Sequence, residues 1–303
     1  MRVCSLVPAA TEVLYALGLG HQIVGVTHEC DWPPEAASCH PITAARLDTD
    51  ELDSAEIDRA VSDAAAQGKP LYAVDAEAWR AVAPDVVVVQ ELCAVCAVST
   101  DDVKDVVRAE GVDARLLQYS PGTLGAVAEA IVELGRELGV PDAAARLRDE
   151  LSEQLRRLDK RLVGASARPR VFVSEWLDPP YVAGHWVPEM VALAGGTDVA
   201  GTPGEPSFRI RWRDAAELRP DVVVLAPCGY DLDRTLDEVD PAALSAELLG
   251  TPAGHEGQVF AVDAKAYYSS PGPRVGVGAE LLGHLLHPEA VPDPGVPWAR
   301  LQI

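Results

Sequence analysis

The sequence has little positive charge. Only four of its 303 residues are lysine, and 25 lysines and arginines stand against 47 aspartates and glutamates, so the formal net charge is -22. A surface of that sign repels phosphate groups, so we expect neither nucleic acid nor an anionic membrane as a partner. No run of basic residues provides a local exception.

Long apolar runs are also missing. No stretch approaches the length of a membrane-spanning helix. The first apolar run breaks at Pro8, too early for a secretion signal. We therefore expect Met1 to begin a folded cytoplasmic domain, with an extracytoplasmic location as the alternative if the N-terminus has been trimmed. Six cysteines fit reduced thiols at least as well as a disulfide framework.

Signatures of catalysis are absent as well. The chain has no Ser-His-Asp order, no phosphate-binding loop and no dinucleotide glycine fingerprint. The glycines at 18 and 20 close a helix rather than open one. We expect a protein that is not an enzyme and has no obligatory cofactor.

The chain does contain strands that alternate with helices. The segment APDVVVVQELCAVC at 83–96 holds a strand of four valines, and RPDVVVLAPC at 219–228 repeats its Pro-Asp-Val-Val-Val core. Alternation at this spacing predicts mainly parallel sheets with helices on both faces. Because a strand, a helix and a PDVVV strand recur in that order, we expect two α/β lobes.

A helical region separates the two repeats. Residues 123–163 are rich in Ala, Leu, Arg and Glu, and the part from Pro141 onwards has a helix-starting proline and apolar residues at helical spacing. We expect a long rigid helix at about 142–163 that joins the lobes. The predicted domains are an N-terminal α/β lobe at 1–120, a helical linker at 121–166 and a C-terminal α/β lobe at 167–303.

Polar and aromatic residues gather where predicted strands end. Ligands of open α/β sheets bind beyond the carboxyl ends of the strands, so these residues are candidates for a ligand cleft between the lobes. The chain has only 16 aromatic residues, yet many lie in these loops, and indole and phenol rings suit a large, flat, partly apolar ligand. The alternative for Trp176 and Trp186 is simple packing. The candidates are Pro8, Thr11, His28, Glu29, Trp32, Gln90, Glu91, Cys93, Glu175, Trp176, Tyr181, His185, Trp186, Arg209, Trp212, Cys228, Tyr230, Tyr267 and Tyr268.

Cys93 and Cys96 form a C-x-x-C motif after the valine strand. Zinc or iron would need further ligands, and His28 and Cys30 could supply them if the strand at 22–27 lies beside the valine strand. A redox pair is a second reading, and small buried thiols are the third. We favour thiols that lie close together without an obligatory metal.

Several segments together resemble the substrate-binding proteins of ABC importers for cobalamin and iron-siderophore complexes, and most closely the cobalamin-binding branch. The resemblance implies two lobes joined by a rigid helix, a ligand held by aromatic side chains, and acidic residues that dock onto a permease. The docking positions implied here are Asp101, Asp102 and Asp214. The segments that carry the resemblance are SLVPAATEVLYALGLGHQIVGVT at 5–27, DWPPEA at 31–36, the twin PDVVV cores, VFVSEWLDPPYVAGHWVPEMVALAGG at 171–196 and RWRDAAELRPDVVV at 211–224.

We therefore expect a monomer that binds a corrinoid, foremost cobalamin, as an importer component or a cytoplasmic relative of one. An acidic helical segment near 50–70 and the QELCAVC loop are additions to the family pattern. Two alternatives stay open. One is a binder of iron-siderophore or haem-type chelates that uses Arg209, Arg211 and Arg213. The other is a metal- or thiol-dependent enzyme centred on Cys30, Cys93, Cys96 and His28.

Overall fold

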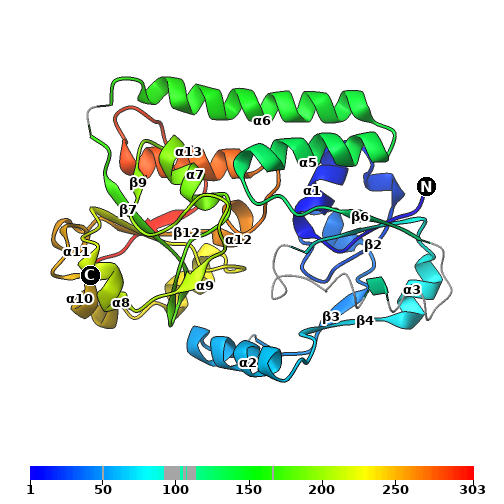
Figure 1. Ribbon diagram of the computed structural model, residues 1–303, viewed down its shortest axis with the longest axis horizontal. Helices are drawn as coiled ribbons and strands as arrows, with labels where there is room; N and C mark the ends of the chain where they lie inside the picture. Colours follow the sequence, from blue (N-terminus) through cyan, green and yellow to red (C-terminus); the bar gives the residue numbers. More distant parts are fainter. Residues whose placement is uncertain (50, 92–102, 105–106, 108–113, 166) are drawn as a thin grey trace. The chain divides into compact units, whose positions relative to one another are not determined.

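The protein consists of two compact units. The computed structural model describes residues 1–49, 51–91, 103–104, 107, 114–165 and 167–303 (Figure 1). No helix within these ranges is long and apolar enough to cross a lipid bilayer. Unit 1 comprises Met1–Leu52, Glu56–Pro121 and Ala126–Asp149, and unit 2 comprises Asp53–Ala55, Gly122–Gly125 and Glu150–Ile303.

Unit 1 is built on a parallel sheet in the order β2-β1-β5-β6. All four valines of β5 are buried, as expected for a strand covered on both faces. Since β1 lies between β2 and β5, the strand at 22–27 does not lie beside the valine strand, which was the condition for His28 and Cys30 to join a metal site with Cys93 and Cys96. The strands are β1 (Val3–Ser5), β2 (Ile23–Val26), β5 (Val86–Val89) and β6 (Arg115–Gln118).

Local signals set the helix starts of unit 1. Pro8 occupies the first turn of α1, where its missing N–H costs no hydrogen bond. Asp75 caps α3 by accepting from the backbone N–H groups of Glu77 at 2.9 Å and Ala78 at 3.0 Å. The smaller elements here are α1 (Pro8–Ala16), short 3₁₀ turns at Gly20–Gln22 and Ala36–Ser38, the antiparallel pair β3 (Thr43–Ala45) and β4 (Tyr72–Val74), α2 (Ser54–Ala66) and α3 (Ala76–Val82).

Two longer helices follow, α5 (Leu124–Glu137) and α6 (Pro141–Leu162), the long green helix of Figure 1. Gly139 connects them at φ +78°, a conformation that glycine adopts without strain. A side chain at Gly135 would collide with the Cβ of Ala144, so the two helices pack closely there. The helix predicted at 142–163 therefore forms, and its residues up to Asp149 belong to unit 1 and the rest to unit 2.

Unit 2 has a mixed sheet in the order β10-β8-β7-β11-β12-β13, with β9 also on β7. The β9-β7, β7-β11 and β11-β12 pairs are parallel, while β7-β8, β8-β10 and β12-β13 are antiparallel. The α/β class is thus confirmed. The strands are β7 (Arg170–Leu177), β8 (Pro180–Val182), β9 (Thr197–Asp198), β10 (Phe208–Arg209), β11 (Val222–Leu225), β12 (Val259–Val262) and β13 (Trp298–Arg300).

Aspartates and a threonine cap several helices of unit 2. Asp231, Asp240, Thr251 and Asp263 each accept from backbone N–H groups of the first turn that follows. These caps satisfy amide groups that have no partner within their helix. The helices are α7 (Val187–Leu193), α8 (Trp212–Glu217), α9 (Leu232–Glu238), α10 (Pro241–Leu248), α11 (Pro252–Glu256), α12 (Ala264–Tyr267) and α13 (Val275–Leu286).

The repeated PDVVV core has the same role in both units. Asp85 accepts from the backbone N–H of Arg2 at 2.7 Å, and Asp221 accepts from that of Arg170 at 2.8 Å. Each aspartate thereby joins its own strand to the start of the neighbouring strand. The repeat in the sequence is therefore a repeat of structure.

Candidate functional site

A network of small polar side chains lies at the carboxyl end of β1. Thr11 Oγ1 donates to Ser5 Oγ at 2.8 Å and lies 3.0 Å from Cys30 Sγ. Thr11 is fully buried, and burial raises the pKa of the Cys30 thiol to about 12. Thr11 and Cys30 were candidates for the ligand and metal sites, and the structure places both in the interior of unit 1, bonded to each other.

His28 is held by a threonine of the neighbouring segment. Its Nδ1 lies 2.8 Å from Thr43 Oγ1, its Nε2 lies 3.3 Å from Glu29 Oε1, and its ring centroid is 5.6 Å from that of Tyr72. Within the described ranges, no group of three or more His, Cys, Asp and Glu side chains is arranged to hold a metal ion. Cys93 and Cys96 lie outside the described residues, as do Asp101 and Asp102. The metal site therefore stays a prediction.

The residues that follow β5 differ in exposure. Gln90 is buried, whereas Glu91 is exposed and accepts from Gln118 Nε2 at 2.9 Å. The backbone N–H of Glu91 also donates to Ser120 Oγ at 2.9 Å. The end of the valine strand is thus held by hydrogen bonds to the residues at the end of β6.

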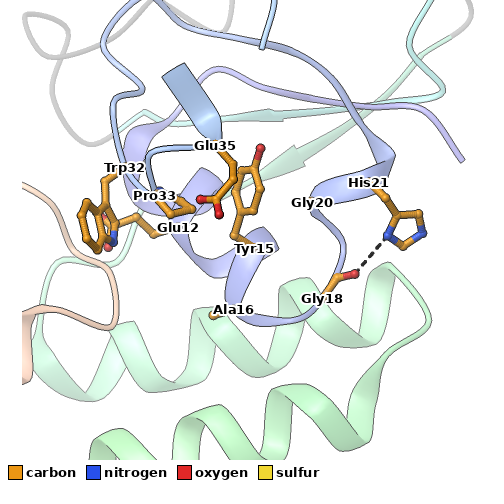
Figure 2. Close-up of a pocket in the computed structure, with 9 residues that line it drawn as sticks. All are labelled: Glu12, Tyr15, Ala16, Gly18, Gly20, His21, Trp32, Pro33 and Glu35. Atoms are coloured by element: carbon orange, nitrogen blue, oxygen red, sulfur yellow. Dashed lines mark hydrogen bonds between the residues drawn. The ribbon is translucent and has the colours of Figure 1, made fainter. Parts of the chain in front are cut away.

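An open hollow of about 570 Å³ runs along α1 (Figure 2). Glu12, Tyr15 and the 45% exposed Trp32 lie along it, and Pro8 begins the same helix. From the sequence we selected Trp32 but missed Glu12 and Tyr15. Their spacing predicts only that they belong to an amphipathic helix, and it does not predict a hollow beside that helix. The hollow combines aromatic rings with carboxylates.

An aromatic pair occupies the carboxyl edge of the unit 2 sheet. Trp176 is the penultimate residue of β7, and Tyr230 follows the parallel strand β11. Their ring centroids lie 5.2 Å apart, edge to face. The guanidinium of Arg234 lies 4.2 Å from the centroid of the Tyr230 ring. On β8, Tyr181 accepts from Arg209 NH2 at 3.1 Å. Indole, phenol and guanidinium groups therefore gather at this edge.

Backbone hydrogen bonds order the same edge. Glu175 Oε1 lies 3.3 Å from the backbone N of Gly184, and the backbone N–H of Cys228 donates to the carbonyl of Glu175 at 2.8 Å. A side chain at Gly184 would collide with backbone atoms of Glu205 and Ser207. Glycine is therefore required for the loop after β8 to approach the segment before β10.

Of the other predicted aromatic residues, Trp186 and Tyr268 lie in the interior of unit 2 and Trp212 is half-buried. Trp186 Nε1 donates to the carbonyl of Tyr268 at 3.0 Å, and the Tyr268 hydroxyl donates to the carbonyl of Gly278 at 2.9 Å. Burial raises the pKa of Tyr268. Trp212 Nε1 donates to the carbonyl of Leu177 at 3.0 Å. These three rings are anchored by backbone acceptors.

His185 and Tyr267 are less buried. His185 has φ +54°, stacks on Trp186 at 5.8 Å, and has no hydrogen-bond partner at its buried Nδ1. Burial lowers the pKa of His185, which favours a neutral imidazole. Tyr267 is half-buried, with the guanidinium of Arg274 5.8 Å from its ring centroid.

Asp214, the described docking candidate, pairs with Arg211, the residue that precedes its helix α8. It accepts from Arg211 Nε at 2.6 Å and from Arg211 NH2 at 2.7 Å, and Arg213 Nε lies 3.7 Å away. The hydrogen bond from Arg211 holds the pKa of Asp214 below its usual value. Any partner arginine would therefore compete with Arg211 for this carboxylate.

Two polar residues of unit 2 were not predicted. The backbone N–H of Ser54 donates to Glu238 Oε1 at 2.5 Å, and the carbonyl of Ser54 accepts from Trp176 Nε1 at 3.0 Å. Ser54 lies 122 positions from Trp176 and 184 from Glu238, so no local pattern could reveal these contacts.

The fold agrees with comparisons to known proteins. Residues 3–266 match the family model described as periplasmic binding protein, so the chain belongs to that family. A vitamin B12-binding protein of Vibrio cholerae serotype O1 is 20% identical over 225 residues, which cover 73% of this chain and 69% of the relative. The family resemblance seen in the sequence is confirmed.

Solved structures share the whole fold. The periplasmic heme-binding protein RhuT from Roseiflexus sp. RS-1 is 24% identical with a TM-score of 0.70, covering 95% of this chain and 98% of that one. The periplasmic vitamin B12 binding protein BtuF of Vibrio cholerae is 20% identical with a TM-score of 0.67, covering 94% and 96%. At these identities the likeness shows the fold alone.

Membership of this family bears on the location of the protein and on whether it is an enzyme. The prediction of a cytoplasmic protein is wrong, because the family model and the similar proteins describe periplasmic binding proteins, which act outside the cytoplasm. The family consists of substrate-binding proteins, which are not enzymes.

Proposed function

We propose that this chain binds a corrinoid, foremost cobalamin, as the substrate-binding component of an ABC importer. The observation that carries the proposal is the aromatic edge of unit 2. There Trp176 and Tyr230 lie at the carboxyl ends of the parallel strands β7 and β11, and Tyr181 of the antiparallel β8 pairs with Trp176. Flat rings of this kind stack on a flat macrocycle. The vitamin B12-binding relative supports the same ligand class.

Polar groups near the strand ends suit the amide side chains of a corrinoid. Gln90 can both donate and accept, while Glu175 and Glu91 can accept. The remaining predicted ligand residues, including His28, His185 and Trp32, stay part of the proposal. A neutral imidazole at His185 is a suitable nitrogen ligand for a metal such as cobalt.

A haem-type chelate is the second candidate. Arg209 is exposed and lies 5.6 Å from the centroid of the Tyr181 ring, which places a cation beside an aromatic face. Haem carries two carboxylates, and a guanidinium can bind them. Because the net charge of the chain is -22, the surface as a whole disfavours anionic ligands and thus favours a corrinoid over haem.

Absorption spectroscopy separates these candidates. The purified protein is mixed with cyanocobalamin or with hemin, desalted, and scanned. We expect cyanocobalamin to remain with the protein at a 1:1 ratio. Retention of hemin alone would support the haem-type function, and retention of neither would overturn both.

A matched pair of variants tests the aromatic edge. Trp176→Ala should weaken cyanocobalamin binding about tenfold, equivalent to about 1.4 kcal/mol, through loss of ring contact. Trp298→Ala removes a tryptophan that is likewise half-buried and packed edge-on, against Phe260, but lies outside the proposed site, so affinity should hold. Calorimetric titration measures both. Equal affinities would remove Trp176 from the ligand site.

Permease docking is proposed at Asp214 and at Asp101 or Asp102. Docking at Asp214 would exchange Arg211 for a permease arginine. We expect Asp102→Arg with Asp214→Arg to abolish association with the permease while cyanocobalamin affinity stays the same. Loss of ligand binding in that double variant would contradict docking and place these residues at the ligand.

A further inference from the structure

The first turn of α2 belongs to unit 2, although the rest of that helix belongs to unit 1. Residues Asp53–Ala55 group with unit 2, while the chain before and after them groups with unit 1. Ser54 is only 3% exposed, which is unusual for a polar residue in an acidic surface helix. This turn lies in the acidic segment that the sequence adds to the family pattern.

Both backbone groups of Ser54 form hydrogen bonds with other residues of unit 2. Its N–H donates to Glu238 Oε1 at 2.5 Å, and its carbonyl accepts from Trp176 Nε1 at 3.0 Å. The N–H of a first-turn residue has no partner inside its helix, so Glu238 satisfies a donor that would otherwise need water. A charged acceptor makes this hydrogen bond stronger than a neutral one.

The same contacts cover the aromatic pair. Trp176 meets Tyr230 edge to face at 5.2 Å, Arg234 lies 4.2 Å from the centroid of the Tyr230 ring, and Tyr230 is only 4% exposed. Glu238 also accepts a hydrogen bond from the Tyr230 hydroxyl. The Ser54 carbonyl thus satisfies the indole N–H of Trp176, while Glu238 and Arg234 contact Tyr230.

We propose that Asp53–Ala55 form a cap on Trp176 and Tyr230, and that a ligand which stacks on these rings must displace the cap. This inference rests on the proposed function, because it takes the pair as the ligand surface. It explains why Tyr230, a ring placed at a binding edge, is buried. The cap lowers the fraction of protein that is ready to bind, and the apparent Kd equals the intrinsic Kd divided by that fraction.

A single backbone atom can be removed to test the cap. Ser54→Pro deletes the N–H that bonds to Glu238, and proline is well tolerated in the first turn of a helix. Ser54→Ala keeps the N–H and the carbonyl and is the matched control. Circular dichroism and thermal unfolding establish that both variants fold like the parent.

Calorimetric titration with cyanocobalamin and with hemin then compares the three proteins. We expect Ser54→Pro to bind about fivefold tighter than Ser54→Ala, since one hydrogen bond to a charged group no longer holds the cap. Stopped-flow mixing should show the gain in the association rate. Equal or weaker binding by Ser54→Pro would overturn the cap, and weaker binding would make the turn a part of the ligand site.

Hydrogen exchange at the Ser54 amide gives an independent reading. In the parent protein this amide should exchange slowly without ligand and quickly once cyanocobalamin is bound. Ligand binding with unchanged protection would overturn the cap and leave the proposed function intact. If none of the three proteins binds either ligand, both the proposed function and the cap are overturned. If Ser54→Pro alone binds a ligand, the cap is strongly supported.

Discussion

The two units use the same strand core but end it in different chemistry. Asp85 and Asp221 each accept a hydrogen bond from a backbone N–H at the start of the neighbouring strand, that of Arg2 and of Arg170 respectively. All residues of β5 and β11 are buried. In unit 1 the strand ends lead into small polar groups: the Thr11 hydroxyl contacts Ser5 and the Cys30 thiol, and the His28 imidazole separately contacts Thr43. In unit 2 they lead into indole and phenol rings. The shared core therefore specifies the scaffold, and the loops after it specify what each scaffold can contact.

The largest difference between the two units should be the loss of stability when one tryptophan of each unit is replaced by alanine. Trp186→Ala removes a side chain that is 5% exposed in unit 2, and should lower the free energy of unfolding by about 3–5 kcal/mol. Trp32→Ala removes a side chain that is 45% exposed in unit 1, and should change it by less than about 0.5 kcal/mol. Urea unfolding measures both, and similar losses would contradict the assignment of Trp186 to the interior.

A smaller difference should follow from the hydroxyl network. Thr11→Val leaves Ser5 and Cys30 without this partner and should cost about 1–3 kcal/mol. Thr235→Val in unit 2 is the control, because its acceptor, the carbonyl of Asp231, keeps the bond from the Thr235 backbone N–H. Chemical unfolding of both variants tests this. If Thr235→Val lowers the free energy of unfolding as much as Thr11→Val does, the hydroxyl network makes no particular contribution to stability.

A pH effect of smaller size is expected from unit 2. Burial lowers the pKa of His185 in the folded state below the value of about 6.5 for an unfolded chain. Between those two pKa values the unfolded chain binds the proton and the folded chain does not, so stability falls as pH drops below about 6.5. His185→Gln should reduce this slope and His255→Gln, at an exposed position, should keep it. Thermal unfolding across pH 5–8 would decide, and an unchanged slope in His185→Gln would count against the shift.

The smallest effect concerns the reactivity of one cysteine in each unit and not the stability of the protein. Cys30 of unit 1 is buried with its thiol pKa raised to about 12, while Cys228 of unit 2 is half-buried. Since the thiolate is the reactive form, iodoacetamide at pH 8 should label Cys228 at least about tenfold faster than Cys30. Peptide mass spectrometry gives both rates. Faster labelling of Cys30 would place it at the surface.

Local signals in the sequence predicted much of the fold. Runs of β-branched residues marked β5 and β11, and the proline at 141 with helical spacing marked α6 at its observed place. The order of strands did not follow from such signals. β1 lies between β2 and β5, because pairing depends on contacts between distant segments. β13, antiparallel at the sheet edge, was missed because a three-residue strand carries almost no pattern.

The candidate site was predictable in composition but not in geometry. Listing residues after strands found Trp176 and Tyr230, since parallel strands end at one edge. The same list could not separate them from Trp186 and Tyr268, whose rings point into the core. The distinction depends on side-chain direction and on partners such as Ser54, which lies 122 positions from Trp176.

The close approach of α5 and α6 has a consequence for descent. No room exists at Gly135 for a methyl group opposite Ala144, because the two positions share one space. Within unit 1, a relative with a larger side chain at position 135 must have a smaller one at position 144, or its two helices must lie further apart. The two positions should therefore change together among relatives, and their combined volume in each relative would give a measure of helix spacing from sequence alone.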